Sequence, residues 1–177
     1  MSTNINEEPK YPTLKAAISL GSNLGESHTI LNKALESLEQ NENITIENIS
    51  NLYETIPVGP PQPNYLNACA ILKTKLSPQT LLKTLLDIET KFGRTRKEKW
   101  GARTLDIDLI LYEQLILETP ELQLPHPRMK DRAFVLVPLA EIAPNWIDPL
   151  TKKTIEELLK NVDTAGILKK IEISTQT

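Results

Sequence analysis

The sequence contains few of the residues that disulfide-linked and cysteine-rich metal-binding folds depend on. It has one cysteine, Cys69, and two histidines among 177 residues. A single thiol excludes both a disulfide framework and a zinc site built from cysteines. Cys69 lies within an apolar run, which is typical of a small buried residue in a reducing compartment. We therefore expect Cys69 to be structural and chemically inert.

Long hydrophobic runs and an excess of positive charge are also missing. Residues 1–14 are polar and offer no apolar core for a signal peptide, and no other run reaches membrane-spanning length. The net charge is −3, whereas proteins that coat nucleic acid or membrane surfaces usually spread positive charge widely. We expect a cytoplasmic monomer with no nucleic-acid partner and no membrane partner.

The length and composition predict one domain. With 177 residues, 40% of them hydrophobic and 24% charged, the chain can bury a sizeable core. We expect residues 1–15 to form a flexible tail and residues 16–177 to form the single domain.

Hydrophobic periodicity predicts the order of the elements. Strands are expected at residues 16–20, 44–54, 65–74 and 105–112, and helices at residues 27–40 and 78–92. A phase slip near Asn48 indicates a bulge in the second strand. Residues 115–124 are typical of short strand or extended chain, and a capping box at Thr154 and Glu157 predicts a last helix. The βαββαβ order indicates an α+β ferredoxin-like sandwich, an antiparallel sheet with both helices on one face, followed by a C-terminal extension.

The strand at residues 105–112 carries the first candidate site. Strict alternation divides its side chains into Leu105, Ile107, Leu109 and Leu111 on one face and Asp106, Asp108, Ile110 and Tyr112 on the other. The two carboxylates are then separated by roughly 7 Å. Two anions held this close are commonest where a divalent cation offsets their repulsion. The alternative is an edge strand with a solvated face.

A basic run precedes the acidic pair. Its cations are Lys91, Arg94, Arg96, Lys97, Lys99 and Arg103, set against a single Glu98. A nucleoside triphosphate with Mg²⁺ requires this combination, because carboxylates hold the metal and guanidinium groups bind phosphate oxygens. A solvated loop is the other interpretation of the run.

Two further residues are unusual for their positions. Asn67 is the one amide on the face of its strand that also carries Tyr65 and Cys69, so it either bonds to nearby backbone or faces a ligand. Glu89 lies at the border of the apolar stripe of its helix. The run from Gly21 to Gly25 is favoured as a plain turn, because it lacks the lysine and the spacing of a P-loop.

The stretch Trp100–Ile110 resembles the signature of the 6-hydroxymethyl-7,8-dihydropterin pyrophosphokinases, folate-pathway enzymes that transfer a pyrophosphoryl group from ATP to a pterin alcohol. Further similarity lies in Ser19–Leu24, Tyr53–Thr55 with the following proline-rich loop, Asn64–Ala68 and Leu124–Lys130. The resemblance covers roughly residues 16–149.

The resemblance implies roles for the charged residues. Asp106 and Asp108 would bind two Mg²⁺ ions that bridge the phosphates of the co-substrate ATP. Arg94 and Arg103 resemble catalytic arginines of a loop that closes between Gly93 and Gly101. Further ATP contacts are implied for Glu89, Arg96, Lys99, Trp100, His126 and Arg132.

The resemblance also implies a pterin site. Its residues would be Thr55, Ile56, Pro57 and Val58 at the edge of the ring, Asn67 in the plane, Tyr65 and Phe134 as apolar slabs, and Trp100 on the closing loop. Ordinary core packing is the alternative for Tyr65 and Phe134, and an exposed loop aromatic for Trp100. The chain departs from the family pattern at Ile56, where proline is frequent, at Lys99, where arginine is common, and at Pro127, where an aromatic residue is frequent.

Two interpretations of another kind remain open. A ferredoxin-like module could bind RNA or sense a ligand without catalysis, although RNA-binding sheets expose paired aromatic residues and aromatic residues make up only 5% of this chain. The chain could also be an inactive relative of the pyrophosphokinases.

Overall fold

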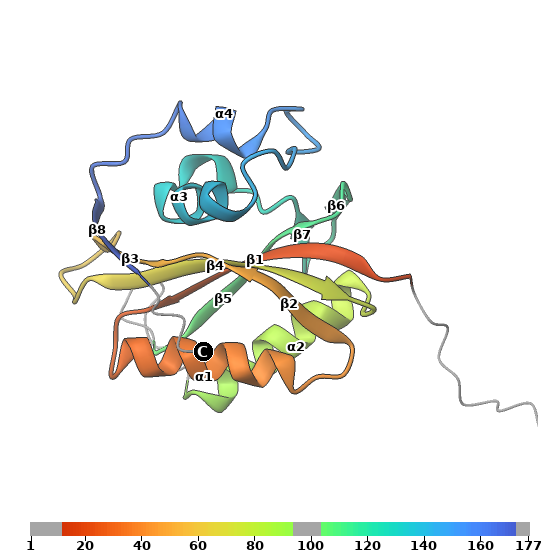
Figure 1. The fold of residues 1–177 in the computed structure, drawn as a ribbon, viewed down its shortest axis with the longest axis horizontal. Coiled ribbons are helices and arrows are strands. Elements are labelled where there is room, and N and C mark those ends of the chain that lie inside the picture. Colours follow the sequence, from red (N-terminus) through yellow and green to blue (C-terminus); the bar gives the residue numbers. More distant parts are fainter. Residues whose placement is uncertain (1–11, 94–103, 173–177) are drawn as a thin grey trace, which may run out of the picture.

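An antiparallel sheet separates two layers of helices (Figure 1). The structure is a computed structural model that describes residues 12–93 and 104–172. The strands in these ranges are β1 (Leu14–Ser22), β2 (Ile44–Ile49), β3 (Leu52–Thr55), β4 (Tyr65–Thr74), β5 (Asp106–Tyr112), β6 (Leu117–Glu118), β7 (Gln123–Leu124) and β8 (Ile167–Ile171). The helices are α1 (Ser27–Glu39), α2 (Pro78–Lys91), α3 (Ala133–Ile142) and α4 (Ile155–Leu159), with a 3₁₀ turn at Met129–Asp131.

The sheet has the strand order β5-β1-β4-β3-β8, and β2 also pairs with β4. Along one edge of β4, β2 and β3 follow one another as two halves of a bent strand. Counted as one strand, they give the ferredoxin-like order, so the predicted fold class is confirmed. The strand predicted at residues 44–54 is interrupted at Ser50, which is buried and whose hydroxyl accepts the N–H of Cys69 at 2.9 Å. The expected bulge is present as a register shift between Ile46 and Asn48.

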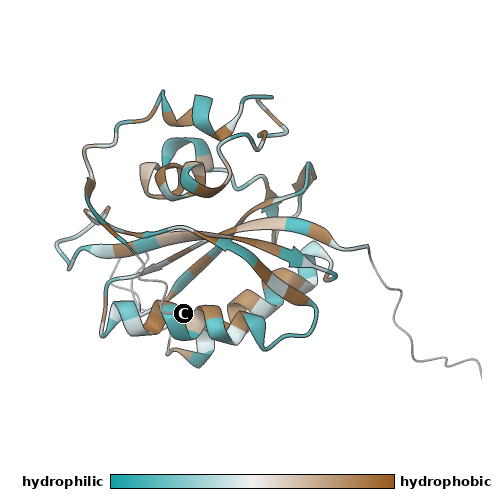
Figure 2. Ribbon diagram, viewed as in Figure 1, coloured by the Kyte–Doolittle hydropathy of each residue, from teal (hydrophilic) through white to brown (hydrophobic). Residues whose placement is uncertain are grey.

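The helices α1 and α2 cover one face of the sheet, as predicted (Figure 1). Both carry hydrophobic and hydrophilic residues in alternating patches (Figure 2). The Ser77 hydroxyl caps α2 by accepting the Thr80 N–H at 3.2 Å, and Gly93 follows its end with φ of 80°, a conformation that glycine adopts without steric cost. The strand β1 begins at Leu14, so Leu14 and Lys15 belong to the sheet.

A bulge in β5 corrects the predicted faces of this strand. The register with β1 shifts between Ala17 and Ile18, where Ile110 is the extra residue of β5. Leu111 therefore joins Ile110 in the core beneath α3, and Tyr112 joins the core beneath α1 and α2. The predicted faces of Leu111 and Tyr112 were wrong, because a bulge inverts the alternation beyond it. Ahead of the bulge, the residues from Leu105 to Leu109 keep the predicted alternation.

The second helical layer consists of α3 and α4 on the opposite face (Figure 1). Val135, Leu136 and Leu139 of α3 pack on Cys69 and its neighbours, so the expectation that Cys69 is buried is confirmed. The predicted capping box starts α4, since the Thr154 hydroxyl accepts the Glu157 N–H at 3.1 Å. No helix within the described ranges is both long enough and apolar enough to cross a membrane.

Candidate active site

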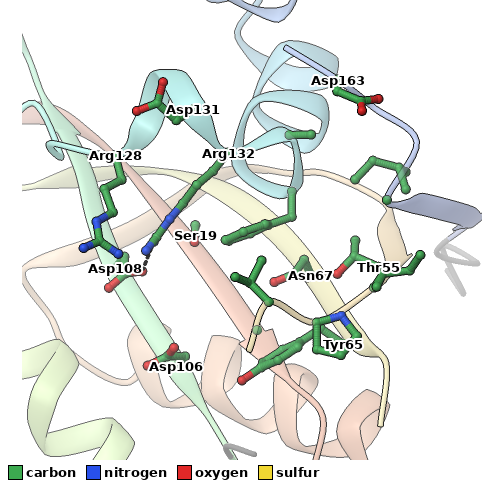
Figure 3. A pocket seen from close by; sticks show the side chains of 18 residues that line it. Ser19, Thr55, Tyr65, Asn67, Asp106, Asp108, Arg128, Asp131, Arg132 and Asp163 are labelled. Carbon is green, nitrogen blue, oxygen red and sulfur yellow. Dashed lines mark hydrogen bonds and ion pairs between the residues drawn. The ribbon is translucent and has the colours of Figure 1, made fainter. Parts of the chain in front are cut away.

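Two neighbouring cavities contain the candidate site. The larger of the two lies between the sheet and the loops that precede α3 and β8, and it has a volume of about 470 Å³ (Figure 3). It is lined by Ser19, Gly21, Thr55, Ile56, Pro57, Val58, Tyr65, Asn67, Asp106, Asp108, Arg128, Asp131, Arg132, Ala133, Phe134, Asp163, Gly166 and Ile167. Its walls therefore combine two aromatic rings, an amide, several carboxylates and two guanidinium groups.

Strand register sets the floor of this cavity. Gly21 of β1 pairs with Asn67 of β4 on one side and with Asp106 of β5 on the other. Ser19 pairs in the same way with Asp108. The acidic pair and the amide thus lie on one face of three neighbouring strands, although Asn67 and Asp108 are 41 residues apart in the sequence.

The amide end of the cavity is preorganised. Asn67 is 5% exposed and Thr55 is 3% exposed, and the Asn67 Nδ2 donates to Thr55 Oγ1 at 2.6 Å. A Cβ atom on Gly21 would lie 2.6 Å from the Asn67 Oδ1, so only glycine leaves room for that oxygen. The pair presents a carbonyl oxygen and a hydroxyl at fixed positions, which suits a planar ligand with donors and acceptors along its edge.

At the acidic end of the cavity, the guanidinium group of Arg132 lies close to Asp108. The Nη1 of Arg132 lies 3.7 Å from the Asp108 Oδ2 (Figure 3), and its guanidinium carbon lies 5.4 Å from the centroid of the Phe134 ring. Burial lowers the pKa of Arg132, and the nearby Asp108 opposes that shift. Arginine nevertheless stays protonated in proteins, so Arg132 places a permanent positive charge beside Asp108.

The smaller cavity, with a volume of about 260 Å³, opens between α2, β5 and the β6–β7 hairpin. It is lined by Leu82, Leu86, Glu89, Ile107, Asp108, Leu109, Pro120, Glu121, Leu122, Gln123, His126 and Pro127. In the described part of the chain, Asp108 is the one residue that lines both cavities. The two cavities therefore meet at the acidic pair.

His126 is held as a neutral donor in the smaller cavity. Burial, followed by the positive charges of Arg132 and Arg128, lowers its pKa to about 4. Its Nδ1 lies 3.2 Å from the backbone nitrogen of Arg128 and accepts that N–H. A neutral imidazole whose Nδ1 accepts carries its proton on Nε2, so His126 offers one donor to a ligand at pH 7.

Glu89 is more deeply placed than the sequence indicated. Its side chain is 1% exposed, and its Oε2 accepts the Ile107 N–H at 3.4 Å. This bond connects α2 to β5 at the residue between Asp106 and Asp108. Glu89 thus belongs both to the wall of the smaller cavity and to the support of the acidic pair.

The acidic pair suits a magnesium ion that arrives with its substrate. Within the described ranges, no group of three or more histidine, cysteine or acidic side chains could enclose a metal ion. Mg²⁺ is commonly bound by one or two carboxylates together with substrate phosphates and waters. Asp106 and Asp108 would supply the hard oxygen ligands for such a site.

Comparisons with known proteins complete the description of the site. The model of the 7,8-dihydro-6-hydroxymethylpterin-pyrophosphokinase family matches residues 17–144. The chain belongs to this family. A Synechocystis protein named 2-amino-4-hydroxy-6-hydroxymethyldihydropteridine pyrophosphokinase is 50% identical over 152 residues, which are 86% of this chain and 78% of that protein. A Bacillus subtilis protein of the same name is 46% identical over 128 residues, 72% of this chain and 77% of its own length.

Solved structures agree with this pyrophosphokinase fold. A crystal structure of Plasmodium falciparum HPPK-DHPS A437G with STZ-DHP superposes with a TM-score of 0.70 over 90% of this chain, at 15% sequence identity. This chain spans 47% of that longer chain. The match therefore concerns the fold.

Most of the residues assigned from the sequence meet in the two cavities. The larger cavity contains Thr55, Ile56, Pro57, Val58, Tyr65, Asn67, Asp106, Asp108, Arg132 and Phe134, and the smaller one contains Glu89, His126 and again Asp108. The remaining candidates, Arg94, Arg96, Lys99, Trp100 and Arg103, lie outside the described residues. The individual roles of all these residues stay predictions.

Several lining residues were not anticipated as site residues. Gly21 had a usable signal, since a glycine inside a strand often marks a close approach, but the sequence favoured a turn there. Asp163, Gly166 and Ile167 had no local signal, because they reach the cavity only through the pairing of β8 with β3. Ser19 had a usable signal in the family resemblance of Ser19–Leu24, whereas Asp131 gave no sign of its position.

Proposed function

We propose that the protein transfers the pyrophosphoryl group of ATP to the hydroxymethyl oxygen of 6-hydroxymethyl-7,8-dihydropterin, releasing AMP, in folate biosynthesis. The observation that carries this proposal is the position of Asp108 in the wall of both cavities. A reaction that joins two substrates needs two binding sites that meet where the bond is made. The family membership of the chain supports the same chemistry.

The larger cavity is the proposed pterin site. A pterin is a flat heterocycle with an amide-like edge, so it needs apolar surfaces above and below and hydrogen-bonding groups in its plane. Tyr65 and Phe134 supply aromatic surface, and the Asn67–Thr55 pair supplies polar atoms at fixed positions. We assign the backbone of Ile56, Pro57 and Val58 to the edge of the ring.

The smaller cavity is the proposed site for the adenosine end of ATP. Its leucines and Ile107 offer apolar contact to a purine. The His126 Nε2–H and the Glu89 carboxylate are two of its polar groups, and the others are on Asp108, Glu121 and Gln123. A nucleotide bound there would direct its phosphates to Asp108, where Arg132 lies 3.7 Å away. Arg96, Lys99 and Trp100 are assigned to further nucleotide contacts from the family resemblance.

Positioning and electrostatics account for the chemistry in this assignment. The hydroxymethyl oxygen attacks the β-phosphorus and loses its proton, the new O–P bond forms, and the bond to the α-phosphate oxygen breaks as AMP leaves. Asp106 and Asp108 would hold two Mg²⁺ ions, which when bound neutralise charge on the phosphates. Arg132, Arg94 and Arg103 would bind phosphate oxygens as charge shifts toward AMP. No covalent bond to the protein is required.

Product identification is the direct test. The purified protein is incubated with ATP, Mg²⁺ and 6-hydroxymethyl-7,8-dihydropterin, and the released nucleotide is identified by ³¹P NMR. We expect AMP together with a pterin diphosphate. Release of ADP would instead show transfer of a single phosphoryl group, and ATP binding without turnover would favour the sensor or the inactive relative.

A pair of variants tests the acidic residues. Asp108→Asn removes a metal ligand on the open face of β5, so we expect kcat/KM to fall by about 100-fold or more, with little change in thermal stability. Asp87→Asn, on the exposed side of α2, is the matched control and should keep wild-type activity. A large loss of stability in Asp108→Asn with full residual activity per folded molecule would assign Asp108 a structural role instead.

We further propose that the enzyme works as a monomer in the cytoplasm and without nucleic acid. The mild negative charge supports the absence of a nucleic-acid partner, and the lack of long apolar runs supports the location.

A further inference from the structure

The C-terminal segment reaches the cavity that we assign to the pterin. Asp163, Gly166 and Ile167 line it together with Thr55 and the loop that follows β3 (Figure 3). The family match ends at residue 144, so it assigns no role to this segment. The wall that these residues form is called here the C-terminal wall, residues 163–167.

Local hydrogen bonds give the C-terminal wall a defined shape. The Asp163 Oδ1 accepts the Ala165 N–H at 2.9 Å, and the Ile167 N–H donates to the Thr164 carbonyl oxygen at 3.0 Å. Side-chain acceptors of this kind stabilise a turn without helix or sheet. The turn delivers Ile167 to the first position of β8.

Strand pairing then joins the wall to the substrate edge. Ile167 pairs with Thr55, and Ile171 pairs with Leu52 at the far end of β8. Beyond the end of β3, the Ile56 N–H donates to the Gly166 carbonyl oxygen at 2.9 Å. A side-chain contact adds to the backbone bonds, since the Lys170 Nζ lies 3.9 Å from the Glu141 Oε1 on α3.

Beyond Thr55, few other contacts from the described residues hold this edge. Ile56 is 51% exposed and Val58 is 68% exposed, so neither is anchored by burial. Pro57 has no N–H to donate. Among the described residues, the bond from Ile56 to Gly166 is therefore the backbone contact that fixes where the Thr55–Val58 segment leaves the sheet.

We propose that the C-terminal wall is a positioning and specificity-determining element for the pterin substrate. Through Gly166 it holds the Thr55–Val58 edge in place, and through Ile167 it limits the space available to the ring at that end of the cavity. This inference rests on the proposed function, because it concerns the same cavity and the same substrate class.

Two isoleucines of β8 provide a matched pair of variants. Ile167→Ala removes apolar surface from the cavity wall, whereas Ile171→Ala removes the same surface where β8 packs against the core beneath α1 and α2. The dissociation constant of 6-hydroxymethyl-7,8-dihydropterin is measured in the presence of α,β-methylene-ATP, which binds without transferring its pyrophosphoryl group. We expect Ile167→Ala to raise it about fivefold and to leave the affinity for the nucleotide analogue within about twofold. Ile171→Ala should lower the melting temperature and change neither affinity.

A second pair of variants tests the turn. Asp163→Ala removes the acceptor of the Ala165 N–H, so the wall loosens and the pterin affinity should fall about as much as in Ile167→Ala. Asp163→Asn keeps an oxygen at the same position and should restore wild-type affinity to within about twofold, since Asn forms the same turn. An Asn variant as weak as the Ala variant would overturn the assignment of Asp163 to the turn.

The outcomes separate this proposal from the function on which it rests. If the wild-type protein binds the nucleotide analogue but not the dihydropterin, the proposed function fails and the wall proposal fails with it. If the wild type binds both ligands and Ile167→Ala matches it, only the wall proposal is wrong. Equal loss of pterin affinity in Ile167→Ala and Ile171→Ala would also overturn it, because a general loosening of β8 would then explain both.

Discussion

Gly21 shows how one missing side chain shapes the larger cavity. It lies between Asn67 and Asp106 in the register of the sheet, and the Asn67 Oδ1 occupies the space where a Cβ would be. The glycine therefore allows the buried Asn67 amide to pack directly over the backbone of β1. Its function is spatial, because it contributes no chemical group to the site.

Replacement of Gly21 should impair pterin binding through Asn67. In Gly21→Ala the new methyl group displaces the Asn67 side chain from its 2.6 Å bond to Thr55, and we expect the KM for the dihydropterin to rise about tenfold. The KM for ATP should change little. Steady-state kinetics with each substrate varied in turn measures both constants.

A double variant controls for general damage. If Gly21→Ala acts through the amide, then Gly21→Ala/Asn67→Ala should be no weaker for the pterin than Asn67→Ala alone, because the partner of the clash is gone. Additive losses would show that the alanine disturbs β1 in some other way.

At the scale of elements, a tether connects α3 to β3. The Tyr53 hydroxyl donates to the Glu141 Oε1 at 2.8 Å, and the Asn51 N–H donates to the Oε2 of the same carboxylate at 2.6 Å. Burial raises the pKa of Tyr53, and the bond to Glu141 raises it further, so the hydroxyl remains a donor. The tether fixes the helix that carries Phe134 over the sheet.

Loss of this tether should cost stability. We expect Tyr53→Phe to lower the free energy of unfolding by about 1.5 to 3 kcal/mol, the usual contribution of a hydrogen bond to a charged acceptor. Urea denaturation of Tyr53→Phe, Glu141→Gln and the double variant measures the coupling between the two residues. Coupling near zero would mean that Tyr53 and Glu141 stabilise the protein independently.

The bulge of β5 marks the limit of periodicity as a guide to elements. Alternation from Leu105 to Leu109 correctly separates core residues from the acidic pair, but it continues wrongly through Leu111 and Tyr112. A bulge adds one residue to a strand and so exchanges the faces of the side chains beyond it. In β5 the residues near the bulge are apolar on both faces, so the sequence pattern does not show where the exchange occurs. The break at Ser50 was missed as well, because the irregularity in residues 44–54 was interpreted as a bulge near Asn48 within one strand.

At the scale of the whole molecule, the sequence predicted the central fold and most of the candidate site. Helical stripes, the cap at Ser77 and the pattern of strands were enough for the ferredoxin-like core. The second layer was harder to predict, since α3 is apolar on nearly every side and β8 is short, and both depend on contacts distant in sequence. The C-terminal wall of the cavity was missed as a consequence.

Acid should destabilise the folded protein through His126. Its pKa is about 4 in the folded state, lowered by burial and by the charges of Arg132 and Arg128, against about 6.5 in an unfolded chain. Between these values the unfolded state binds a proton that the folded state does not, so the free energy of unfolding decreases as the pH falls from about 6.5 to about 4. This contribution is fully present above pH 6.5.

Denaturation curves at several pH values test this dependence. Between pH 7 and pH 5, the wild-type protein should lose more stability than His126→Gln, which cannot titrate. Measurements above pH 5 limit the contribution of carboxylates, whose pKa values lie near 4. Parallel losses in the two proteins would show that His126 is not the titrating group.

The shared wall at Asp108 also has a consequence for inhibition. If the larger cavity binds the pterin and the smaller one the adenosine end of ATP, as proposed, a single ligand with a flat polar heterocycle at one end and a purine at the other can fill both. Once one end has bound, the linker keeps the other end at a high effective concentration near its own cavity. A short linker could therefore combine the binding free energies of the two ends with little further entropic cost. The length of that linker is set by the carboxylate that separates the cavities.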